Sequence, residues 1–159
     1  MLEWLESSGV ARLVQESAWG YPIVLSAHAV GMAILAGIVL MINFRVIGLA
    51  PNVPLSALRS IYRVALVGLV INAISGTMLF VANPDAFVQS TPFWLKMGNL
   101  AIGITLLLVM AQRLFSPVGL VAGEAPGKDA KMLAWISSIA WFGVIVMGRL
   151  IAYWDWKDF

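Results

Sequence analysis

The chain contains no cysteine among its 159 residues. That absence excludes disulfide bonds, thiolate catalysis and cysteine-ligated zinc or iron–sulfur clusters. His28 is the only histidine, so a metal site built from several histidines of one chain is also excluded. Charged residues make up 11% of the chain, whereas about 25% is usual in soluble domains. The net charge of +2 is too small to predict nucleic-acid binding.

Apolar residues are what the chain has in abundance. They account for 61% of the sequence, and the mean hydropathy is +0.91. A single water-soluble core cannot bury that much apolar surface, so lipid must cover part of it. The sequence therefore predicts one integral membrane domain over residues 1–159, with the lipid bilayer as its surroundings. Phosphate-binding loops, HExxH motifs and Ser–His–Asp arrangements are absent from the sequence, so nothing in it indicates an enzyme.

Four apolar stretches are long enough to cross a bilayer, which takes about 20 helical residues. The first has no charged residue between Ser17 and Phe44. Breaks rich in proline and glycine separate the stretches, and Asn83-Pro84 is typical of a short surface helix, expected at Asp85 to Val88. We predict an all-α fold, a four-helix transmembrane bundle with spans at about 18–48, 56–81, 92–115 and 130–153. Residues 1–16 alternate leucines with charged residues and predict a short amphipathic surface helix.

The ten basic residues are divided unequally between the two sides of this predicted bundle. Six lie at the side of the first and third loops, and four lie at the side of the two termini. Lysine and arginine favour the cytoplasmic side, so both termini are predicted to lie outside. The expected location is the bacterial inner membrane, crossed several times, with periplasmic termini.

Polar side chains within the predicted spans gather in the outer half of the bundle. His28 lies seven residues after Tyr21, which is roughly 10 Å along a helix. Antiparallel spans bring five other polar residues to a similar depth: Asn72, Ser75, Lys96, Asn99 and Arg149. Because ionisable groups inside a membrane are costly, this polar layer is the candidate functional site.

Three interpretations of His28 remain open. In the first, its ring is hydrogen-bonded to Ser75 or Asn72 and holds two helices together. In the second, it is the axial ligand of a haem b iron, which is the only metal role expected for it. The sixth ligand would then be Met32, Met78, Met97 or Met147, or His28 of a second copy. In the third, His28 belongs to a proton relay or a substrate site.

The two basic residues of this layer also have alternative roles. Lys96 and Arg149 would pair with haem propionates, or form a cationic pocket for a quinone or an anionic headgroup. Alternatively, both are long side chains near helix ends that extend to the lipid headgroups. The predicted functions are thus a haem b redox or electron-transfer protein, a non-catalytic scaffold or accessory subunit, and a small transporter or channel component.

Small residues mark the faces on which helices are expected to touch, because they let backbones approach each other in lipid. Ala29, Ala33 and Gly37 form such a stripe on the first span. On the second span, a small and polar stripe is expected to face the bundle centre; it contains Gly68, Asn72, Ser75 and Gly76. Self-association into a homo-oligomer, or membership of a membrane complex, is the corresponding expectation.

Several short motifs together resemble a family of small bacterial four-helix integral membrane proteins of unknown function. They are Ser17 to Pro22, Leu25 to His28 with Gly31, Asn43 to Gly48, Gly76 to Phe80 with Asn83-Pro84, and Pro92 to Lys96. The chain is also similar, more loosely, to the membrane domains of copper-resistance D-type proteins and b-type cytochromes. That second resemblance implies histidine high in a four-helix unit and haem b as the cofactor.

Overall fold

A computed structural model describes residues 2–114 and 127–153, apart from the side chains of residues 55, 56 and 114. The described residues form helices and turns only. The helices are α1 (Glu3–Glu6), α2 (Gly9–Glu16), α3 (Gly20–Ile47), α4 (Leu55–Ala82), α5 (Pro84–Gln89), α6 (Thr91–Leu114), α8 (Lys128–Leu150) and the 3-10 helix η1 (Ile151–Tyr153). Four segments are long and apolar enough to cross a membrane: Gly20–Ile47, Ala57–Ala82, Thr91–Arg113 and Lys128–Tyr153. The predicted all-α four-helix bundle is confirmed, and residue 115 of the third predicted span lies outside the described residues.

The helix ends follow the local signals in the sequence. Gly48 has φ 104°, a left-handed conformation that glycine adopts without steric cost, and its N–H donates to Phe44 O, which ends α3. Asn83 ends α4 and begins α5, because its side chain accepts from Ala86 N at 3.4 Å and Pro84 follows it. The predicted short surface helix is therefore present and runs one residue further at each end.

The amino-terminal segment forms α2, preceded by the single turn α1. Ser8 breaks the two apart, since its hydroxyl accepts from Ala11 N at 3.2 Å and caps α2. Ala11 and Val14 are buried, and α2 packs across the ends of α3 and α4. Gln15 Nε2 donates to Ala82 O, which satisfies a carbonyl left free at the end of α4.

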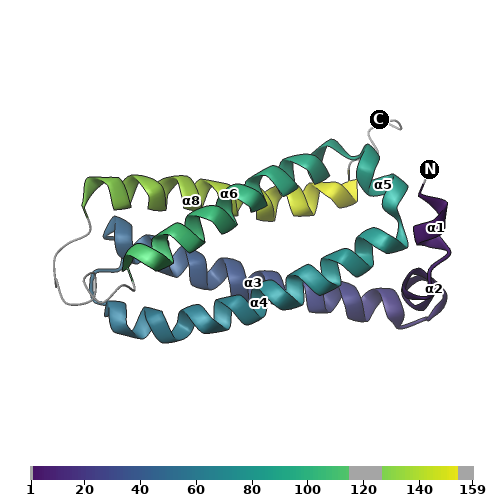
Figure 1. The fold of residues 1–159 in the computed structure, drawn as a ribbon, viewed down its shortest axis with the longest axis horizontal. Coiled ribbons are helices and arrows are strands. Elements are labelled where there is room, and N and C mark those ends of the chain that lie inside the picture. Colours follow the sequence, from purple (N-terminus) through teal and green to yellow (C-terminus); the bar gives the residue numbers. More distant parts are fainter. Residues whose placement is uncertain (1, 115–126, 154–159) are drawn as a thin grey trace.

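The long helices form two pairs. α3 packs along α4 and α6 packs along α8, and contacts between α3 and α8 join the pairs. Figure 1 shows α1, α2, α5 and η1 at one end of the bundle, here named the α5 end, and the turn between α3 and α4 at the other. The α5 end is the end that the charge pattern predicts to lie outside.

α3 and α4 approach each other closely at Gly31 and Gly68. A Cβ atom at Gly31 would lie 3.0 Å from Asn72 N and 3.1 Å from Gly68 O, so the two backbones touch. The predicted stripe on α4 faces α3: Gly68, Asn72 and Ser75 are buried, and Gly76 is half-buried with the ring of His28 beside it. The predicted stripe on α3 is wrong as a contact within the bundle: Ala29, Ala33 and Gly37 are exposed, since they lie on the side of α3 away from Gly31.

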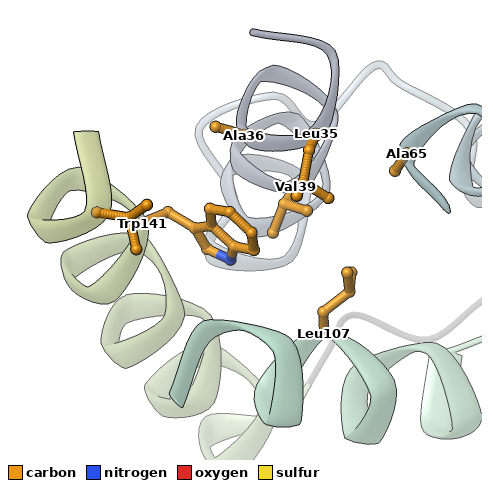
Figure 2. Close-up of a cluster of buried hydrophobic side chains, with 7 residues drawn as sticks. Leu35, Ala36, Val39, Ala65, Leu107 and Trp141 are labelled. Atoms are coloured by element: carbon orange, nitrogen blue, oxygen red, sulfur yellow. The ribbon is translucent and has the colours of Figure 1, made fainter. Parts of the chain in front are cut away.

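The middle of the bundle is filled by Trp141, whose side chain is fully buried. Its indole lies among Leu35 and Val39 of α3 and Leu107 of α6, with Ala65 of α4 at the far side of the cluster (Figure 2). Nearer the turn between α3 and α4, the side chain of Asn43 donates to Ser137 Oγ at 3.0 Å, and both residues are buried. This hydrogen bond joins α3 to α8 between Trp141 and the end of the bundle opposite the α5 end.

Candidate functional site

A cleft of about 1000 Å³ lies between α4 and α6 towards the α5 end. At that end α5 connects the two helices, as Figure 1 shows. Residues of α3, α4, α5 and α6 line most of this α4–α6 cleft, and Gln15 of α2, Gly148 of α8 and two residues of η1 also border it; most of the lining residues are apolar. Its volume is at the upper end of the range for small-molecule and cofactor sites, roughly 300–1,000 Å³.

His28 of α3 lies on the wall of this cleft, and one nitrogen of its ring is hydrogen-bonded to α4. Nδ1 lies 3.1 Å from Ser75 Oγ. Ser75 has a single hydroxyl proton, and Oγ lies 2.6 Å from Ile71 O, to which it donates. The hydroxyl oxygen therefore accepts from Nδ1–H, which places the ring proton on Nδ1 and leaves a lone pair on Nε2.

Lys96 of α6 reaches that lone pair. Its Nζ lies 3.3 Å from Nε2 of His28, and since an ammonium group only donates, Nε2 is the acceptor. Lys96 is half-buried. Among the described residues, no aspartate or glutamate lines the cleft, and His28 is the polar partner of the ammonium group.

Two further contacts fix His28 in place. The side chain of Asn72 donates to His28 O at 2.9 Å and is 6% exposed. Gly76 lies directly beside the ring, because a Cβ atom there would approach His28 Cε1 to 3.0 Å. The predicted hydrogen bond from the ring to α4 is thus present at Ser75, whereas Asn72 binds the backbone of His28.

The other two predicted members of the polar layer face elsewhere. Asn99 donates to Leu95 O at 2.8 Å and packs against Gly143 of α8, where a Cβ atom would come within 2.7 Å of its Oδ1. Arg149 is exposed and donates to the hydroxyl of Tyr153 at 2.6 Å, with its guanidinium 4.9 Å from the centre of that ring. Neither residue lines the cleft.

The sequence patterns did not indicate the part of the cleft lining at the end of α4, in α5 and at the start of α6. Three phenylalanines pack together there: the rings of Phe80 and Phe93 are stacked with centroids 5.7 Å apart, and Phe87 lies 5.5 Å from Phe93. Ser90 also lines the cleft; it is 6% exposed, and its hydroxyl has no hydrogen-bond partner among the described residues. The Ser-Thr-Pro motif indicates a helix start, but nothing in it indicates that the serine faces a cleft.

Candidate iron ligands besides His28 are few. Of the four methionines considered from the sequence, Met97 is the one found among the residues that line the cleft. Met32 and Met78 pack against the apolar clusters around Leu35 and Val14. Over residues 2–114 and 127–153, no group of three or more His, Asp or Glu side chains is placed to hold a metal ion.

Comparisons with protein-family models, with curated proteins and with solved structures find no match for this chain. The chemistry of the site therefore follows from its geometry. An imidazole lone pair and an ammonium group meet in a largely apolar cleft that is large enough for a cofactor.

Proposed function

We propose that the protein binds haem b in the α4–α6 cleft and acts as a membrane redox protein, with Nε2 of His28 as an axial ligand of the iron. The observation that carries this proposal is the hydrogen bond from Nδ1–H to Ser75. Metal-binding histidines typically donate their second ring N–H in this way, which fixes the tautomer and directs the other nitrogen at the metal.

The residues of the cleft fit a haem group. The cleft has sufficient volume, most of its wall is apolar, and Gly76 lets the His28 ring lie close against α4. Met97 supplies a thioether on the same wall. Lys96 has to leave Nε2 for the iron to bind there, and its long side chain permits that movement. The haem group, when bound, supplies one-electron redox chemistry.

An absorption spectrum of the detergent-purified protein, expressed with ample haem, tests this proposal. We expect haem bands for the wild type and for Asn99→Ala, because Asn99 faces α8. His28→Ala is expected to lose them. Haem bound equally by His28→Ala would remove this histidine from the role, and wild-type protein without haem bands would end the proposal.

A structural role is the second candidate, and a different observation favours it. His28 is bonded to Ser75 and Asn72 of α4 and to Lys96 of α6, so it joins three helices without any ligand. In a scaffold or accessory subunit, His28→Ala would lower the melting temperature of protein that contains no haem. An unchanged melting temperature would contradict that role.

We also infer the location and assembly from the sequence and the fold. Both α1 and η1 lie at the α5 end, and the basic residues near the opposite end support placing that opposite end in the cytoplasm of a bacterium. Ala29, Ala33 and Gly37 lie exposed on α3, which supports self-association through small residues.

A further inference from the structure

The ammonium group of Lys96 lies in the cleft without a counter-charge among the described residues. Its described polar partner is the uncharged imidazole of His28, and the described residues that line the cleft include no acid. A half-buried cation in apolar surroundings is costly unless an anion accompanies it. Arg149 shows the contrast, since it is exposed at the helix end and bonded to Tyr153. The apolar surroundings of Lys96 therefore indicate that its ammonium group binds an anionic ligand.

A second polar group of the cleft also lacks its partner. Ser90 is 6% exposed, lines the cleft, and its hydroxyl is unpartnered among the described residues. Most buried hydroxyls in proteins are hydrogen-bonded, so an unpartnered one on a cleft wall indicates a ligand atom. Ser90 precedes Lys96 by six residues, about 9 Å along a helix. Helical side chains lean towards the amino-terminal end of their helix, so Lys96 extends from α6 in the direction of the α5 end.

The remainder of the cleft wall suits an apolar molecule. The rings of Phe80, Phe87 and Phe93 lie against one another beside Ser90, and Leu25 of α3 and Ile104, further along α6, also line the wall. Polar groups and apolar rings thus line the same cleft. A ligand that matches both has a charged head and an apolar body.

We propose that the α4–α6 cleft binds a carboxylate carried on an apolar body, with Lys96 as its ionic partner and Ser90 as a second hydrogen-bond donor. The propionate of a porphyrin and the head of a fatty acid both have this chemistry. Because the contact needs no iron, the proposal stands or fails separately from the ligand role of His28.

Binding of metal-free protoporphyrin IX to the detergent-purified full chain tests the proposal. The variants are Lys96→Met and, as a matched control, Lys131→Met, which removes an exposed lysine of α8. We expect the wild type and Lys131→Met to bind protoporphyrin IX at least about tenfold more tightly than Lys96→Met. The dimethyl ester of protoporphyrin IX has no carboxylate, and all three proteins should bind it equally weakly.

Two further arms complete the test. cis-Parinaric acid, a fluorescent fatty acid, distinguishes the two kinds of carboxylate ligand. If its binding depends on Lys96, the cleft accepts the head of a fatty acid. If only the binding of the porphyrin depends on Lys96, the carboxylate is a porphyrin propionate. Ser90→Ala should weaken binding of the free acid several-fold without lowering the melting temperature, because its hydroxyl has no described partner to lose.

Three results would overturn the proposal. One is an affinity of Lys96→Met for protoporphyrin IX within about twofold of that of Lys131→Met. Another is that the wild type binds protoporphyrin IX and its dimethyl ester with equal affinity. The third applies if Lys96→Met does not fold: an affinity of Ser90→Ala for protoporphyrin IX equal to that of the wild type would then contradict the proposal. Haem bands that persist in His28→Ala bear on the iron ligand alone and leave this result intact.

Discussion

Replacing Gly31 by alanine is expected to push α3 away from α4. The new Cβ atom would lie 3.0 Å from both Asn72 N and Ile71 Cγ2, and 3.1 Å from Gly68 O. Favourable contacts between carbon atoms lie at about 3.5–4.0 Å, so the helices have to separate by several tenths of an ångström. Two of these three atoms belong to the backbone and cannot rotate away. The displacement would fall one turn from His28, where α3 and α4 are also hydrogen-bonded.

The size of the effect follows from two opposing terms. Overpacking a tight interface by a methyl group costs about 1–3 kcal/mol. Alanine in place of glycine inside a helix returns roughly 0.5–1 kcal/mol through its higher helix propensity. The net loss of stability is therefore expected to be about 1–2 kcal/mol.

Gly98→Ala is the matched control, because Gly98 is an exposed helical glycine of α6 and nothing outside the backbone of its own helix lies within 4 Å of its Cβ position. That variant receives the propensity gain alone and should be slightly stabilised. Unfolding of both variants in mixed detergent micelles, followed by circular dichroism, measures the difference. Equal unfolding midpoints for Gly31→Ala and Gly98→Ala would refute the close approach of α3 and α4.

Three other predictions concern the site, the lower core and the orientation. Ser75→Ala removes the acceptor for Nδ1–H of His28 and should weaken haem binding by about 10–100-fold in a spectral titration. Thr105→Ala is the control: the exposed hydroxyl of Thr105 bonds to a carbonyl of its own helix, so its loss should leave haem binding unchanged. Ser137→Ala leaves the buried amide of Asn43 without its 3.0 Å partner and should destabilise the bundle by about 1–3 kcal/mol. Adding Asn43→Leu to that variant should recover most of the lost stability. If stability is not recovered, another contact is responsible for the loss. In a bacterial host, alkaline phosphatase fused to the carboxyl terminus should be active and a fluorescent protein fused there dark, and the reverse pattern would place the termini inside.

The spans could be predicted because the signals for them are local. An uncharged run from Ser17 to Phe44 and proline-containing breaks determine where α3 to α6 begin and end. The break at Ser8 has a local cause too, since serine before Gly9 is a helix-capping signal that the charge pattern of residues 1–16 obscures.

The directions of the polar side chains could not be predicted in the same way. Asn99 follows Lys96 by three residues and points only about 60° away from it around the helix. Yet the long side chain of Lys96 reaches His28 of α3, whereas Asn99 packs against Gly143 of α8, the helix along which α6 packs. Depth in the membrane follows from residue number, whereas the neighbour that a side chain meets depends on how each helix is rotated. The cleft itself lies between α4 and α6, so it is a tertiary feature.

The central claim is that the imidazole of His28 binds the iron of haem b. A reduced-minus-oxidised absorption spectrum of His28→Gly, recorded with and without added imidazole beside the wild type, tests it most directly. The expected result is haem bands in the wild type, their loss in His28→Gly, and their return when imidazole occupies the space that the side chain has left. Haem bands that persist in His28→Gly without imidazole, or a wild-type spectrum without any haem band, would contradict it.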